Sequence, residues 1–239
     1  MFAASLIALM ALGQVEAPTE LTLANGMKWV LVPRPDRGII GGAVVVRAGG
    51  ADEVEGHTGV AHMLEHLAFK GTPLIGSKQG WSTEEPLQRA VFDIEDRLAQ
   101  LEASGQSNAP ETQTLLTKLV PAERDWSAAY DSSAFHVLLF KHDIRINAHT
   151  SKDLTSFEGE FPSGSLGVWL AGEAQRFAAP VFRDFRAERG VVLQELKDGE
   201  SETKREMDRF YELAFANTPY AWSTIGHERD VRTISPSSV

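Results

Sequence analysis

The sequence predicts an α+β fold in which an antiparallel sheet has helices packed on one face and carries an inserted helical hairpin. Two observations support this class. The first part of the chain alternates β-branched runs with Gly-containing turns, which indicates strands, while later segments repeat apolar residues at helical spacing. The 239 residues suit one large domain or two small ones, and no internal repeat is visible. We therefore expect one domain over residues 19–239, preceded by a signal peptide at residues 1–18.

The predicted strands begin with a β-hairpin. Residues 21–23 and 28–32 flank Asn25 and Gly26, a dipeptide whose tolerance of positive φ suits a two-residue hairpin turn. Residues 42–47 read GAVVVR and form a third strand, because β-branched side chains favour extended backbone. The sheet is thus expected to start in the first fifty residues.

The next element is a helix over residues 59–69. Thr58 is placed to cap its N-terminus, and Gly71 and Pro73 close its C-terminus. This helix carries the residues with the most distinctive chemistry in the chain.

Residues 77–126 form a more polar segment with its own helical pattern. Leu87, Val91, Leu98 and further apolar residues recur at helical spacing, residues 105–110 read as a turn, and residues 111–119 read as a returning helix. We interpret the segment as a peripheral helical hairpin inserted between two parts of the main fold. Since it contributes none of the site residues predicted below, we expect its removal to leave the site intact.

Beyond the hairpin, the pattern predicts two short strands and then helices. The strands fall at residues 135–140 and 144–147. The helices fall at residues 166–178 and 185–215, the second weakened locally by glycine.

Composition excludes some classes of function and site. The formal net charge of -10 and the lack of any cluster of Lys and Arg argue against a nucleic-acid partner. The chain contains no cysteine, so a transition metal would have to be held by imidazole and carboxylate groups. The seven histidines are therefore the first residues to inspect.

The N-terminal residues resemble a secretory signal. The apolar run in residues 1–13 is too short to span a bilayer and fits the hydrophobic region of a signal peptide, so no stable membrane span is expected. A periplasmic or secreted protein is therefore favoured. The alternative is a cytoplasmic protein whose first residues form a buried helix or follow a misassigned start codon.

The sequence HMLEH at residues 62–66 predicts a metal site. His62 and His66 are four residues apart and share one face of a helix, so both imidazoles can reach one ion at about 2 Å. Glu65 stands between them, where it can accept a proton from a water molecule activated by the metal. We therefore predict a hydrolytic zinc site with Glu65 as the general base.

A third protein ligand is needed, and spacing alone leaves it open. Glu188 and Glu195 lie two turns apart on one face of the predicted helix, so one could bind the ion while the other orients a ligand. Either could equally be an ordinary solvated glutamate.

The run GVAHMLEHLAFKGT at residues 59–72 resembles the family of pitrilysin, insulysin and the mitochondrial processing peptidases, whose signature helix carries HxxEH. The stretch ERGVVLQE is similar to the family's second motif, which implies that Glu195 is the third zinc ligand and Glu188 supports the site. NAHT at residues 147–150 resembles the strand that pairs with an extended substrate, which implies that Asn147 and Ala148 bind the peptide. The resemblance implies a processing-peptidase-like N-terminal unit with one Zn²⁺ per chain.

Three departures from the family pattern stand out. The two metal motifs are further apart than usual, and residues 77–126 account for the difference. The glycine-rich approach to the Asn-Ala strand is missing from residues 141–146. The third departure is that the likeness covers a first α+β unit alone, whereas members enclose substrate with a homologous second half that supplies an Arg-Tyr pair.

Two functions are therefore weighed. The first is a zinc-dependent endopeptidase that cleaves extended peptides or unfolded segments, together with a homologous C-terminal half or partner subunit carrying the Arg-Tyr pair. The alternative is a non-catalytic metal-binding or scaffold subunit of a two-chain peptidase. The intact set of ligands and base favours the first.

Overall fold

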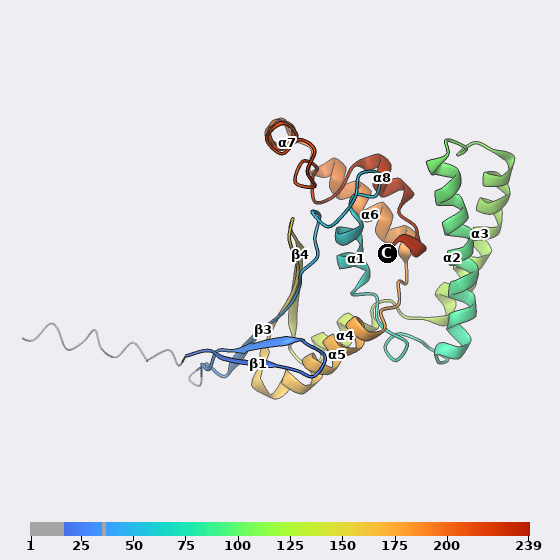
Figure 1. The fold of residues 1–239 in the computed structure, drawn as a ribbon. Coiled ribbons are helices and arrows are strands. Elements are labelled where there is room, and N and C mark those ends of the chain that lie inside the picture. Colours follow the sequence, from blue (N-terminus) through green and yellow to red (C-terminus); the bar gives the residue numbers. More distant parts are fainter. Residues whose placement is uncertain (1–16, 35–36) are drawn as a thin grey trace, which may run out of the picture.

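The computed structural model describes residues 17–34 and 37–239, so the predicted signal peptide lies almost entirely outside the described residues. Strands and helices occur in separate groups along the chain, as in an α+β protein (Figure 1). The strands are β1 (Thr19–Thr22), β2 (Lys28–Leu31), β3 (Ile39–Val46), β4 (Arg145–Thr150) and β5 (Thr155–Pro162). The helices are α1 (Val60–Leu67), α2 (Trp81–Ala103), α3 (Pro110–Ala129), α4 (Ala134–Phe140), α5 (Leu166–Ala178), α6 (Phe185–Asp198), α7 (Glu202–Ala214) and α8 (Glu228–Thr233), with short 3-10 turns at Ser163–Ser165 and Pro236–Ser238.

The main sheet has the antiparallel order β3-β5-β4, and β1 and β2 form the predicted hairpin as a separate pair. Gly42, Gly159 and Ile146 lie beside one another across the three strands. The two glycines make room for the indole of Trp169 on α5, because a Cβ at either would lie within 2.6 Å of that ring. Helices therefore pack on one face of the sheet, which confirms the predicted class.

Three apolar clusters hold the layers together. One lies between α1, α6 and α8, a second joins α4 and α5 to the sheet, and a third lies within the α2–α3 hairpin and the residue that follows it. The helices α1 and α6 lie between the sheet and the hairpin (Figure 1). Within the described residues, no helix is both long and apolar enough to cross a membrane.

The structure corrects several predictions. Residues 135–140 are not a strand but helix α4, because Phe135 and Leu139 are buried one turn apart while Val137 is exposed. A short apolar run of this kind cannot be assigned by periodicity alone. The helix predicted over residues 185–215 is divided near Gly199, and Ser201 caps α7 by accepting a hydrogen bond from the Lys204 backbone N–H.

Strand β5, at the centre of the sheet, was not predicted. Its sequence TSFEGEFP contains glycine, proline and two glutamates, residues that are uncommon in strands. The alternation of Phe157 and Phe161 with the two glutamates was the available signal in the sequence. Other predictions are confirmed, including the bounds of α5 and the pairing of two helices in the hairpin.

Candidate metal centre

Helix α1 turns its two histidines away from the apolar core. Met63 and Leu67 are fully buried against α6 and α8, which directs His62 and His66 to another face of the helix. The two imidazole rings meet edge to face with their centroids 4.8 Å apart. The predicted spacing of four residues therefore brings both rings to one place.

The N-terminus of α1 is capped differently from the prediction. Thr58 is buried, but its hydroxyl donates to Asp230 at 2.7 Å and does not cap the helix. The carboxylate of Glu53 instead accepts hydrogen bonds from the backbone N–H groups of Gly59 and Ala61, both at 2.8 Å. A carboxylate in this position satisfies free N–H groups and complements the helix dipole. Gly59, with a φ of 90°, occupies the N-cap position itself, so Thr58 lies one residue too early to cap the helix.

Helix α6 brings a carboxylate to the two imidazoles. The Oε2 atom of Glu195 lies 3.7 Å from Nε2 of His62 and 3.5 Å from Nε2 of His66. All three donor atoms lie within 4.8 Å of one another. Ligands that share a tetrahedral zinc ion at about 2.0–2.1 Å are separated by roughly 3.4 Å, so these side chains fit such an ion with small adjustments.

The protonation of His62 suits metal binding. Burial, and after it the neighbouring His66, lowers the pKa of His62 to about 4, so the ring is neutral at pH 7. Among the described residues its buried Nδ1 has no hydrogen-bond partner. Its Nε2 faces the Glu195 carboxylate at a separation longer than a hydrogen bond. Neutral imidazole and carboxylate together are the donor set that zinc accepts.

Glu188 occupies the opposite side of His66. Its Oε2 lies 3.3 Å from Nδ1 of His66, and its Oε1 lies 2.5 Å from Nζ of Lys70. Burial opposes ionisation of Glu188, but hydrogen bonds from His66 and Lys70 outweigh it and lower the pKa of this carboxyl. The bond to Glu188 raises the pKa of His66 and, in the neutral ring, places the proton on Nδ1 and leaves Nε2 free.

Glu65 is held by a contact from the sheet. The hydroxyl of Thr150, at the end of β4, donates to Oε2 of Glu65 at 2.6 Å. Glu65 also lines a cavity of about 300 Å³ between α1 and β4, together with Asn147 and Ala148. The residues predicted for the base and for substrate binding therefore border the same open space.

Strand β4 forms an edge of the described sheet, because it pairs with β5 alone. Asn147 is exposed and Ala148 is partly buried on the side of α1. Residues of this edge strand line the same cavity as Glu65, so an extended chain could lie along it.

Three contacting residues were missed by sequence reasoning. Lys70 follows His66 by one helical turn, a spacing that could have revealed it. Thr150 belongs to the NAHT stretch but had no predicted role. Glu53 lies in a polar loop with no signal that points to α1.

Comparison with known proteins finds similar peptidases. Residues 37–80 match the family described as Insulinase (Peptidase family M16). The chain is 45% identical over 141 residues to Zinc protease PqqE of Helicobacter pylori (strain ATCC 700392 / 26695), a match that covers 51% of this chain and 31% of that protein.

Solved structures share the fold. A protease from Helicobacter pylori superposes with a TM-score of 0.66 at 23% identity over 94% of this chain and 42% of the other. The periplasmic protease PqqL from Escherichia coli superposes with a TM-score of 0.61 at 19% identity over 92% of this chain and 19% of the other. This chain thus spans less than half the length of each of these relatives.

Proposed function

Because this chain belongs to the insulinase family of peptidases, we propose that it is the zinc-binding domain of a metalloendopeptidase, with His62, His66 and Glu195 as ligands. The observation that carries the proposal is the convergence of three donor atoms from α1 and α6 within 4.8 Å. The name of the relative, Zinc protease PqqE, supports zinc as the metal. We propose one ion per chain, because the three donor atoms form one cluster. Glu188 supports the site from the other ring nitrogen of His66.

Glu65 is the general base of the proposed reaction. Zinc bound to the three ligands would supply a Lewis acid that polarises the peptide carbonyl and lowers the pKa of water. Glu65 accepts the proton of the attacking water and passes it to the leaving nitrogen. The Thr150 hydroxyl holds one carboxylate oxygen, which limits the directions in which Glu65 can turn.

The proposed substrate is an extended peptide or an unfolded segment. It adds a strand to the free edge of β4 beside Asn147 and Ala148, where backbone hydrogen bonds give affinity with little dependence on sequence. The adjoining cavity leads from this edge to Glu65 and His66.

A complete enzyme needs more protein than this chain. The chain covers 31% of PqqE and 42% of the similar Helicobacter structure, which supports a second homologous half or partner subunit. The Arg-Tyr pair that this half would carry is proposed from the family resemblance alone. We also propose a domain over residues 19–239 with helices inserted at 77–126, a signal peptide at 1–18 and a periplasmic location, the last supported by the description of PqqL.

Two measurements test the proposal. Elemental analysis of the purified chain should find about one zinc per molecule, which Glu195→Ala should remove. A peptidase assay of the chain alone and with its second half then separates an enzyme from a non-catalytic scaffold subunit. Zinc binding without cleavage in either assembly would favour the scaffold.

A further inference from the structure

We propose that the α2–α3 hairpin is a positioning element, which sets the orientation of α6 and thereby places the Glu195 carboxylate opposite the two imidazoles. This inference rests on the proposed zinc site and gives a function to a segment that supplies none of its ligands. It replaces the expectation that residues 77–126 are peripheral.

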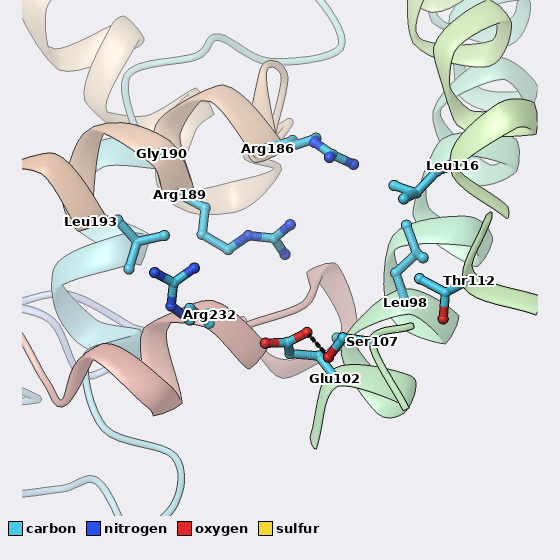
Figure 2. A pocket seen from close by; sticks show the side chains of 11 residues that line it. Leu98, Glu102, Ser107, Thr112, Leu116, Arg186, Arg189, Gly190, Leu193 and Arg232 are labelled. Carbon is cyan, nitrogen blue, oxygen red and sulfur yellow. Dashed lines mark hydrogen bonds between the residues drawn. The ribbon is translucent and has the colours of Figure 1, made fainter. Parts of the chain in front are cut away.

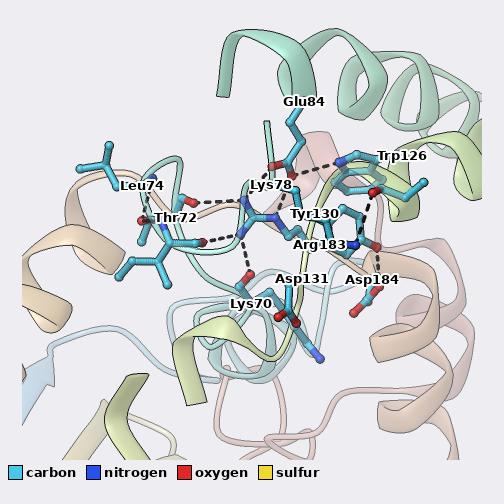
Figure 3. A network of polar contacts seen from close by, with 12 residues as sticks. Lys70, Thr72, Leu74, Lys78, Glu84, Trp126, Tyr130, Asp131, Arg183 and Asp184 are labelled. Atoms are coloured by element: carbon cyan, nitrogen blue, oxygen red, sulfur yellow. Dashed lines mark hydrogen bonds and ion pairs between the residues drawn. The ribbon is translucent and has the colours of Figure 1, made fainter. Parts of the chain in front are cut away.

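The first tie is a buried ion pair between the hairpin and Arg183, two residues before α6. Arg183 is fully buried, and Glu84 on α2 is 1% exposed. Nε of Arg183 donates to Oε1 of Glu84 at 2.7 Å and a second guanidinium N–H donates to Oε2 at 2.9 Å. The indole of Trp126 on α3 donates to the same carboxylate at 3.2 Å (Figure 3). A two-point pair of this kind fixes direction as well as distance.

The same guanidinium also holds the turn that follows α1. Its remaining N–H groups donate to the backbone carbonyls of Lys70, Thr72 and Ile75 at 2.8–3.1 Å (Figure 3). The turn packs closely around this side chain, because a Cβ at Gly71 or Gly76 would lie 2.6 Å or less from its Nη1 atom. Arg183 therefore joins the end of the histidine helix, the start of the glutamate helix and the hairpin at one point.

The second tie lies further along α2. Glu95 has a fully buried side chain, and its oxygens accept hydrogen bonds from Arg189 at 2.8 Å and from Arg186 at 3.3 Å. Glu84 and Glu95 are three helical turns apart on one face of α2, about 16 Å along its axis. Two anchors at this separation define the direction of α6 and its rotation about its own axis.

The two faces of α6 are coupled by the helix itself. Glu188 and Glu195 share the face toward α1, whereas Arg186 and Arg189 point toward α2. A rotation of α6 that moved the arginines away from Glu95 would carry Glu195 away from Nε2 of His62. Metal ligands must be held within about 0.5 Å of their working geometry, so a small rotation is enough to weaken binding.

Apolar packing between the hairpin and this part of α6 is incomplete. A cavity of about 380 Å³ separates them, with Leu98 and Leu116 on the hairpin and Leu193 on α6 around it (Figure 2). The guanidinium groups of Arg186 and Arg189 reach from α6 into the space on the hairpin side (Figure 2). Because apolar side chains do not close this gap, the hairpin holds this part of α6 through the ion pairs, which add to the apolar core that α6 shares with α1 and α8.

Zinc affinity of a double variant tests the proposal. Glu84→Gln/Glu95→Gln keeps the size of both side chains but removes both charges, and it should weaken zinc binding about tenfold or more, the scale found for loss of outer-shell support. The matched control is Glu85→Gln/Glu111→Gln, which changes two exposed carboxylates of the hairpin and should bind zinc as the wild type does. Competition with a chelator gives the affinities, and circular dichroism of the metal-free proteins shows that each is folded.

A double-mutant cycle separates positioning from general loosening. If the hairpin acts through Glu195, then Glu195→Ala should weaken zinc binding less in the Glu84→Gln/Glu95→Gln background than in the wild type. Additive losses would overturn the proposal, as would wild-type affinity in the double variant. Glu95→Gln alone keeps the Glu84–Arg183 pair and tests the same coupling if the double variant does not fold. A wild-type chain that bound no zinc would contradict the proposed function as well, so the two failures are distinguishable.

Discussion

The two sides of helix α6 use carboxylates in opposite ways. Toward α1, the Glu195 side chain is 45% exposed, and its Oε2 atom lies 3.5 and 3.7 Å from two imidazole nitrogens, distances too long for good hydrogen bonds. Toward α2, Glu84 and Glu95 are buried and paired with arginine at 2.7–3.3 Å. Ligand atoms that converge without hydrogen bonds to one another can bind an added cation, whereas buried carboxylates paired with arginine hold the helices in place. One helix thus serves a chemical face and a structural face.

The largest effect should come from removing a donor on the chemical face. His66→Ala takes away one of three proposed ligands, so zinc affinity should fall by more than the roughly 10- to 100-fold that loss of an outer-shell partner causes. Elemental analysis after gel filtration measures the content. His149→Ala, which removes an exposed imidazole on β4, should retain zinc. Full zinc content in His66→Ala would show that the ligand assignment is wrong.

A second test separates base from ligand on the same face. Glu65→Gln keeps the size of the side chain but cannot accept a proton, so hydrolysis should fall by at least about a hundredfold while zinc stays. The rate has to be measured on the assembly that cleaves peptides, with the second half present. Equal cleavage with Gln at position 65 would refute the mechanism. Loss of zinc together with activity would make Glu65 a ligand and Glu188 the first candidate for the base.

Removal of a buried carboxylate from the structural face should lower the free energy of unfolding. Glu84→Ala leaves the guanidinium of Arg183 buried without its counterion, so the free energy of unfolding should fall by about 3–5 kcal/mol. Glu85→Ala on the next residue removes an exposed pair with Arg89 and should change it by less than about 1 kcal/mol. Urea unfolding of the metal-free proteins measures both. Similar losses of unfolding free energy in the two variants would show that the buried pair stabilises the fold no more than the exposed pair does.

The smallest effect concerns the orientation of the base. Thr150→Val removes the hydroxyl that donates to Glu65 at 2.6 Å, so turnover should fall about tenfold with zinc content unchanged. Thr150→Ser keeps the hydroxyl and should keep most of the activity. A serine variant as slow as the valine variant would show that the methyl group, not the hydrogen bond, matters.

The chemical face was more predictable from sequence than the structural face. His62 and His66 are local neighbours on one helix, so their spacing alone brings them together, and the resemblance selected Glu195 over Glu188. The Arg183–Glu84 pair joins residues 99 apart in sequence, and nothing local distinguishes these side chains from solvated ones. The fold shows the same contrast between local and distant contacts. Helix α5, which depends on local spacing, was predicted to the residue, whereas β5, which pairs with strands β3 and β4, was missed.

The free edge of β4 has a further consequence for handling the protein. An unpaired strand edge accepts any extended backbone, and a neighbouring molecule at high concentration offers one as readily as a substrate does. Arg145 lies on this edge strand and the protein has a formal net charge of -10, and such charges discourage pairing between copies. We therefore expect self-association to increase as salt screens these charges. The same exposed hydrogen-bonding groups would then serve catalysis in dilute solution and drive aggregation in concentrated solution.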